Sequence, residues 1–196
     1  MAKLYFRYGA MNCGKTASLL QVVHNYEELH KIVILMKPSL DTKGGHKVTS
    51  RTGLSRDVDI SIHSGESIIE LVKDRAYDAI IVDEAQFLEP EQIDELYKIT
   101  KVLDRPVLCY GLRCDFKMEG FPGSTRLLQI ADTIEEIKSI CPCGKKATQN
   151  MRLINGTPIF EGDQIIIDDK TNISYKGVCG ECFLKNREKT THENRF

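Results

Sequence analysis

The chain has 196 residues, which is enough for one full hydrophobic core and a small additional unit but too few for two full-sized domains. Its 27 basic and 28 acidic side chains leave a formal charge of −1, and no long lysine or arginine run occurs, so we expect no nucleic-acid partner. No apolar run approaches the roughly 18 residues of a membrane helix, and no signal peptide is evident. We therefore expect a cytoplasmic protein without a membrane partner.

A phosphate-binding motif directly follows the first predicted strand, 4–8. Its last two residues, Lys15 and Thr16, are expected to reach the β- and γ-phosphates and to supply a hydroxyl ligand to Mg²⁺. An exposed glycine-rich turn is the alternative, but a strand before the motif and a helix after it favour phosphate binding. The positions that fit G-x-x-x-x-G-K-S/T are Gly9, Ala10, Met11, Asn12, Cys13, Gly14, Lys15 and Thr16.

Apolar runs alternate with amphipathic stretches up to about residue 138, and this pattern predicts an α/β fold with a parallel sheet covered by helices. The further predicted strands are 32–36, 59–63, 79–82 and 107–110, and the predicted helices are 16–29, 66–73 and 91–103. The polar segment 38–56 and the segment 111–123 are expected to be long loops after strands. Ligands of open α/β sheets bind at those strand ends.

Two adjacent carboxylates end the predicted strand 79–82. Asp83 is expected to hold Mg²⁺, directly or through water, and so to partner the phosphate loop. Glu84 is free to accept a proton from an attacking hydroxyl group or from water. The alternative for Glu84 is a solvated acid that only favours the dipole of the next helix.

Cysteines and short strands dominate after residue 140. Cys141 and Cys143 form one close pair, and Cys179 and Cys182 form another. Four thiolates make a closed tetrahedral zinc site, so we predict a structural Zn²⁺ in a small zinc-ribbon-like β annex. The Asn155-Gly156 dipeptide between two apolar runs predicts a hairpin turn.

These patterns divide the chain into three parts. We expect a nucleotide-binding α/β domain over 1–138, a zinc-binding annex with a substrate-covering loop over 139–185, and a frayed polar tail over 186–196. The other three cysteines, at positions 13, 109 and 114, have no partner at ligand spacing. They are expected to be small packing residues.

The combined motifs resemble bacterial thymidine kinases of the small, zinc-containing type II. The similarity rests on AMNCGKT at 10–16, VDEAQF at 82–87, GLRCDF at 111–116 and the late cysteine pairs. It implies a P-loop NTPase-type sheet and transfer of the γ-phosphate of ATP, with Mg²⁺, to the 5′-hydroxyl of thymidine, with deoxyuridine as a further acceptor. The products would be dTMP, for DNA synthesis, and ADP. The family resemblance also implies a homotetramer and feedback inhibition by dTTP.

The resemblance assigns roles to individual positions. It places the general base on Glu84, the metal aspartate on Asp83, and a nucleotide-side role on Gln86. The thymine would be held by main-chain groups of the loop 166–175, where Asp168-Asp169 replaces a family glycine pair, and Lys43 stands where the family has an arginine. The implied substrate-binding residues are Met11, Asp41, Phe87, Leu112, Phe116, Arg152 and Tyr175.

The sequence motifs alone leave three alternative functions open. A kinase for another deoxynucleoside would carry the same motifs. A DNA-dependent ATPase would share the acidic strand but would need a second motor domain and a basic groove. A non-catalytic zinc-ribbon module would leave the phosphate loop without a purpose.

Overall fold

The computed structural model describes residues 1–41, 45–165 and 172–193. Its core is a six-stranded parallel sheet with strand order β5-β2-β6-β7-β1-β8. The strands are β1 (Leu4–Tyr8), β2 (Val33–Pro38), β5 (Ile60–Ile62), β6 (Ala79–Val82), β7 (Val107–Gly111) and β8 (Thr133–Glu136). The fold class predicted from the sequence, a P-loop-type α/β sheet with a β annex, is confirmed.

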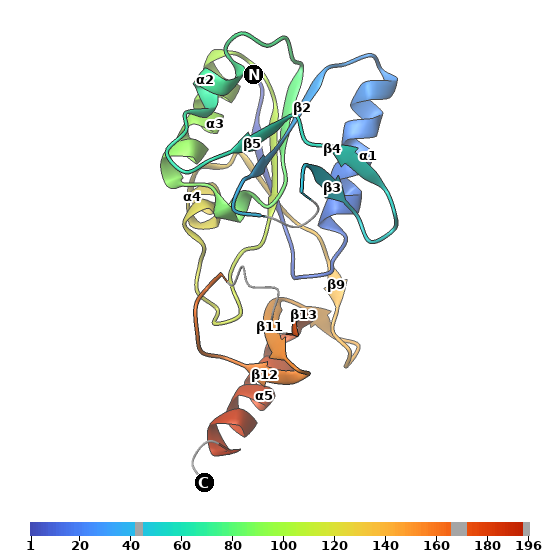
Figure 1. Ribbon diagram of the computed structural model, residues 1–196, viewed down its shortest axis with the longest axis vertical. Helices are drawn as coiled ribbons and strands as arrows, with labels where there is room; N and C mark the ends of the chain where they lie inside the picture. Colours follow the sequence, from blue (N-terminus) through green and yellow to red (C-terminus); the bar gives the residue numbers. More distant parts are fainter. Residues whose placement is uncertain (42–44, 166–171, 194–196) are drawn as a thin grey trace.

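Helices cover both faces of this sheet (Figure 1). One face carries α1 (Lys15–Glu28), and the other carries α2 (Ile68–Val72), α3 (Pro90–Val102) and α4 (Pro122–Ile130). Alternate residues of β6 explain the double cover, because Ile80 and Val82 belong to the core under α2 to α4, whereas Ala79 and Ile81 belong to the core under α1. The nearly unbroken apolar runs therefore form strands that are buried on both sides.

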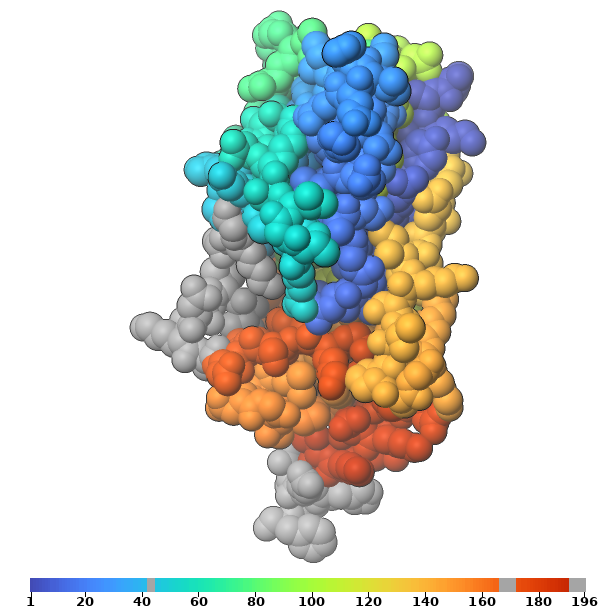
Figure 2. Space-filling model, turned by 90° about the vertical axis from the view of Figure 1, so that its right-hand side faces the viewer, coloured from blue at the N-terminus to red at the C-terminus, as the bar shows by residue number. Residues whose placement is uncertain are grey.

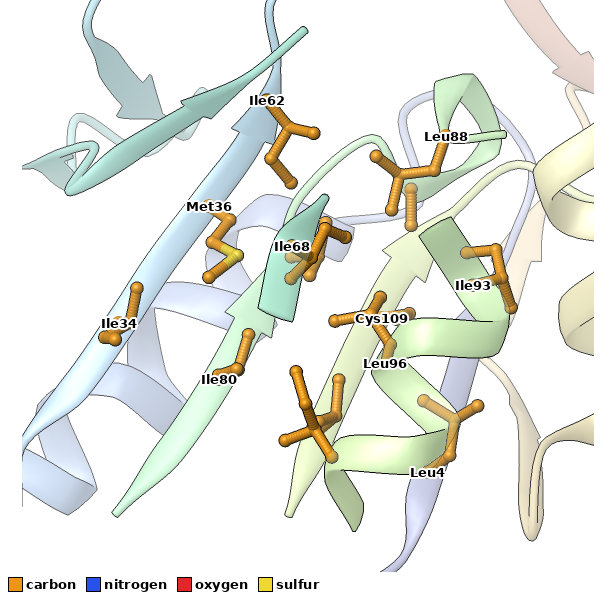
Figure 3. Close-up of a cluster of buried hydrophobic side chains, with 14 of the residues drawn as sticks. Leu4, Ile34, Met36, Ile62, Ile68, Ile80, Leu88, Ile93, Leu96 and Cys109 are labelled. Atoms are coloured by element: carbon orange, nitrogen blue, oxygen red, sulfur yellow. The ribbon is translucent and has the colours of Figure 1, made fainter. Parts of the chain in front are cut away.

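Figure 3 shows the larger of these two cores, between the sheet and helices α2 and α3. Ile34 and Met36 of β2 face the same layer as Ile80, and Ile93 and Leu96 of α3 close it from the other side. All five side chains are almost wholly buried. The core fixes the sheet rigidly, so the loops at its carboxyl edge start from fixed points.

The annex lies beyond that edge and is built from antiparallel strands and one helix (Figure 1). Its elements are β9 (Ser139–Ile140), β10 (Lys146–Ala147), β11 (Gln149–Ile154), β12 (Thr157–Ile159), β13 (Ile173–Val178) and α5 (Gly180–Glu193). The turn between β11 and β12 confirms the predicted hairpin, because Asn155 and Gly156 have φ values of 51° and 82°, the positive values that a type I′ turn requires.

All eight strands and helices predicted before residue 138 are confirmed, with small shifts or none at their ends, and two expectations are wrong. The segment 38–56 is not only a loop: β3 (Lys47–Thr49) and β4 (Ser55–Asp57) pair in it as an antiparallel hairpin, with Val48 buried against α1. The expected frayed tail from residue 186 instead continues α5 as far as Glu193. The sequence analysis also missed α4 and β8; β8 is an edge strand with few apolar residues.

The annex packs directly on the phosphate loop. In Figure 2 the blue N-terminal segment meets the orange and red annex. Strand β13 approaches so closely that a Cβ atom at Gly177 would lie 2.9 Å from the main-chain oxygen of Met11 and 3.2 Å from Cβ of Ala10. A glycine is needed here because two backbones meet.

Candidate active site

A cavity of about 410 Å³ opens at the carboxyl edge of the sheet. Its walls come from the phosphate loop, the ends of β2 and β6, and the β3-β4 hairpin, which places it where ligands of open α/β sheets bind. The lining residues that the sequence predicted are Met11, Asn12, Cys13, Gly14, Lys15, Thr16, Asp41, Asp83 and Glu84.

The phosphate loop turns tightly before α1. Gly14 has a φ of 87° and caps the helix, a conformation that favours glycine. Lys15 is 8% exposed, and its Nζ donates to the main-chain oxygens of Ala10 at 3.2 Å and Gly9 at 3.5 Å. The ammonium group therefore lies over the loop. At the start of the loop, a Cβ atom on Gly9 would lie 2.4 Å from Cys13 Sγ, so the turn leaves no room for a side chain there.

Asp83 and Glu84 follow β6 and face the phosphate loop across the cavity. Asp83 is 5% exposed, and its Oδ1 accepts a hydrogen bond from the main-chain N–H of Glu84 at 3.0 Å. Glu84 has a φ of 50°, a left-handed conformation that is uncommon for glutamate and that turns the chain sharply after the strand. The two carboxylates are therefore held in different positions beside one cavity.

Burial and, after it, the neighbouring Glu84 carboxylate raise the pKa of Asp83 to about 7, while the hydrogen bond from the Glu84 N–H and the charge of Lys15 oppose the shift. A carboxylate in this setting needs a cation. The carboxylate of Asp83 and the hydroxyl of Thr16 line the same cavity, and such hard oxygen ligands suit Mg²⁺. The residues present therefore fit a magnesium ion.

Gln86 connects the acidic pair to the next strand. Its Nε2 donates to Oε2 of Glu84 at 2.5 Å, and its Oε1 accepts from the main-chain N–H of Leu112 at 3.1 Å. The side chain is 1% exposed and does not line the cavity with the phosphate loop. It therefore holds the Glu84 side chain in place, and its nucleotide-side role stays a prediction.

Of the implied substrate-binding residues, Asp41 and Met11 line this cavity, whereas Arg152 contacts Phe116 and Tyr175 where the segment after β7 meets the annex. Leu112 and Phe116 are buried there, and Phe87 packs edge to face on Phe121 with ring centroids 5.6 Å apart. Arg152 of β11 stacks on Phe116 and donates from Nε to the Tyr175 hydroxyl at 3.0 Å. Met11 joins the two regions, since it lines the cavity and its N–H donates to Asn150 Oδ1 at 2.7 Å.

The four late cysteines come together as predicted. The Sγ atoms of Cys141, Cys143, Cys179 and Cys182 all lie within 4.8 Å of one another. The Cys143 sulfur lies 3.4 Å from that of Cys141 and 3.6 Å from that of Cys179, near the roughly 3.8 Å edge of a tetrahedron with zinc–sulfur bonds of about 2.3 Å. The donor set fits a structural zinc ion.

The sequence analysis missed several residues of this site. Lys37 at the end of β2 is 3% exposed, and its Nζ lies 3.0 Å from Asp41 Oδ2. Lys47 and Arg51 of the β3-β4 hairpin bring two further cations to the cavity. Only their place in a basic segment between strands could have indicated them. Lys43, Asp168 and Asp169 lie outside the described residues, as does the loop 166–175 between positions 166 and 171.

The phosphate loop, the acidic strand end and the parallel sheet together define a P-loop nucleotide-binding protein with the groups needed for phosphoryl transfer. The family model described as thymidine kinase matches residues 2–183. The chain belongs to the thymidine kinase family, and its activity is ATP-dependent phosphorylation of thymidine.

Individual relatives agree. The thymidine kinase of Enterococcus faecalis is 45% identical over 199 residues and covers 100% of both chains, and that of Idiomarina loihiensis is 46% identical, covering 91% of this chain and 94% of its own. A solved structure of Pif1 helicase from Candida albicans is a distant neighbour, with 16% identity, a TM-score of 0.44, and coverage of 71% of this chain and 36% of its own. In the part of the chain described, no helix is long and apolar enough to cross a membrane.

The buried Asp83 carboxylate makes stability depend on pH. Because its pKa is raised in the folded state, ionising it costs stability as the pH rises from about 4 to 7, by up to about 1.4 kcal/mol per pH unit. We expect Asp83→Asn to melt above the unaltered protein in Mg²⁺-free, nucleotide-free buffer, with a gap that widens between pH 5 and pH 8. Thermal unfolding at the two pH values measures this, and Asp57→Asn, at a side chain that is 80% exposed, is the control. A difference in melting temperature between Asp83→Asn and the unaltered protein that narrows as the pH rises would contradict this prediction.

Proposed function

We propose that the cavity binds the triphosphate of ATP and that thymidine enters beside it, with its 5′-hydroxyl next to Glu84. The observation that carries this assignment is that the phosphate loop, Asp83 and Glu84 line one cavity although they are far apart in the chain. Phosphoryl transfer depends mainly on positioning and on charge stabilisation, and this cavity offers both.

The donor half is built from cations and main-chain N–H groups. Lys15 exchanges its two main-chain acceptors for phosphate oxygens, and the N-terminus of α1 faces the same charge. A magnesium ion held by Asp83 and Thr16 would neutralise charge on the transferred group. Lys37, Lys47 and Arg51 add positive charge on the far wall.

Glu84 is the proposed general base. Its carboxylate takes the proton of the 5′-hydroxyl while that oxygen forms a bond to the γ-phosphorus, and the bond between the γ-phosphorus and the bridging oxygen breaks. The products are thymidine monophosphate and ADP, and the proton remains on Glu84 until solvent removes it. Gln86 keeps Oε2 of Glu84 hydrogen-bonded, which limits the carboxylate to a narrow range of orientations.

The acceptor base is proposed to lie between β7 and the annex. The proposed lining residues are Met11 and Leu112, together with Phe116 and Tyr175, whose ring centroids lie 3.6 and 5.4 Å from Arg152 Cζ. Apolar and aromatic side chains suit a pyrimidine ring, and main-chain groups can complement its polar edge. Asp41 remains the proposed sugar-side or phosphate-side acid.

Four features of the proposal rest on the family rather than on the geometry. They are a homotetrameric assembly, inhibition by dTTP, use of deoxyuridine as a second acceptor, and a location in the cytoplasm. The partition of the chain near residue 138 is likewise proposed, with zinc stabilising the annex that follows.

The acceptor is tested with the unaltered protein, ATP-Mg²⁺ and each of thymidine, deoxyuridine, deoxycytidine and deoxyadenosine. We expect thymidine to be phosphorylated best and deoxyuridine next, because the chain belongs to the thymidine kinase family and the two bases share the same 2,4-dioxopyrimidine edge. Chromatography of the nucleoside monophosphates measures the products. Preference for deoxycytidine or deoxyadenosine would indicate another kinase, and ATP hydrolysis stimulated by single-stranded DNA but not by thymidine would indicate a DNA-dependent ATPase.

Glu84→Gln is expected to reduce kcat about a hundredfold or more while ATP still binds, because the amide keeps the shape but cannot accept the proton. Steady-state kinetics and equilibrium binding of an ATP analogue separate the two effects. Glu91→Gln, in the first turn of α3, is the matched control and should keep full turnover. A Glu84→Gln enzyme with unchanged kcat would remove Glu84 from its role.

The cysteine cluster is expected to hold about one zinc ion per chain, and Cys179→Ser should lose it, because an alcohol replaces one of four thiolate ligands. Elemental analysis measures the zinc, and proteolysis of the annex reports its stability. Cys114→Ser, at a buried thiol outside the cluster, should keep the zinc. Full zinc content in Cys179→Ser would exclude this donor set.

A further inference from the structure

Arg152 is a buried cation whose nitrogens all donate to neutral groups. It is 1% exposed. Its Nε donates to the Tyr175 hydroxyl at 3.0 Å, and Nη1 and Nη2 donate to the main-chain oxygens of Asp163 at 2.8 Å and Gln164 at 3.0 Å. Among the residues that the structure describes, no carboxylate accepts a hydrogen bond from this guanidinium, and a buried charge without such a partner is costly. The arrangement therefore needs a reason beyond packing.

The guanidinium also covers an aromatic ring of the proposed base pocket. Its Cζ lies 3.6 Å from the ring centroid of Phe116 and 5.4 Å from that of Tyr175. Arginine is suited to this place because its planar fork can stack on one ring while donating hydrogen bonds in its own plane. Phe116 follows β7 and Tyr175 lies in β13, so one side chain fixes rings from the sheet domain and from the annex.

A second link strengthens the same connection. Gln164 donates from Nε2 to Oδ2 of Asp115 at 3.1 Å, and Oδ1 of Asp115 accepts the main-chain N–H groups of Lys117 and Glu119 at 2.8 and 2.9 Å. The segment that carries Phe116 is therefore held to the Asp163-Gln164 segment by both Arg152 and Asp115. Movement of either segment would break several hydrogen bonds at once.

We propose that Arg152 is a positioning residue for thymidine, which acts through Phe116 and Tyr175 and does not touch the substrate. This inference rests on the proposed function, because it assumes that the two rings line the base pocket. It differs from the direct substrate contact implied by the family resemblance, because the guanidinium is 1% exposed and three of its five N–H groups, one on each nitrogen, already donate within the protein.

Arg152→Lys tests the proposal, because lysine keeps the charge but cannot stack and serve three acceptors together. We expect the KM for thymidine to rise roughly tenfold or more, with the KM for ATP within about twofold of the unaltered enzyme. Arg152→Met should behave alike. Arg126→Met, which breaks an ion pair with Asp94 between α4 and α3, is the matched control. It should leave the KM for thymidine and the KM for ATP unchanged.

A double-mutant cycle separates positioning from direct contact. Tyr175→Phe removes one acceptor of Arg152, so its effect on the KM for thymidine should not add to that of Arg152→Lys. Additive effects would indicate a direct substrate contact. An unchanged KM for thymidine in Arg152→Lys, or an equal rise in both KM values, would overturn the inference. Failure of the unaltered protein to phosphorylate thymidine would instead refute the proposed function.

Discussion

The position of the annex relative to the sheet domain depends on its contact with the phosphate loop. Asn150 of β11 accepts the N–H of Met11 on Oδ1 and donates from Nδ2 to the main-chain oxygen of Cys114 at 2.8 Å, and it is 4% exposed. A third bond joins Asn12 Nδ2 to the Tyr175 main-chain oxygen at 3.1 Å. Buried polar groups satisfied in this way are costly to separate. The annex is therefore fastened to the phosphate loop rather than being a separate appendage.

The parallel sheet explains why distant residues share one cavity. Strands β1, β2, β6 and β7 run in the same direction, so their carboxyl ends bring the phosphate loop, Lys37, Asp83 and Leu112 to one edge. The core under α3 holds the ends of these strands rigidly. The loops that follow them therefore lie close together. The close approach of these groups shifts the pKa of Asp83. Burial raises this pKa, whereas Lys15 lowers it and a bound cation would lower it as well.

Much of the fold could be predicted because local pattern and tertiary environment agree. Strand Ala79–Val82, for example, is apolar throughout and buried on both faces. The β3-β4 hairpin could not, because its burial depends on one residue, Val48, packing on α1. Motifs located the phosphate loop, the acid pair and the cysteines. Asn150 and Lys37 have no motif, and their roles arise from contacts between residues far apart in sequence.

Strand β13 connects the phosphate loop to the cysteine cluster, two sites with different chemistry. Its residue Tyr175 accepts a hydrogen bond from Asn12, its Gly177 lies against Met11, and the strand is followed at once by Cys179 of the sulfur cluster. With so short and straight a path, the annex cannot open locally without disturbing the phosphate loop. Amide hydrogens of the phosphate loop and of β13 would then exchange through one common opening event. The local stability of the phosphate loop would be limited by the stability of β13.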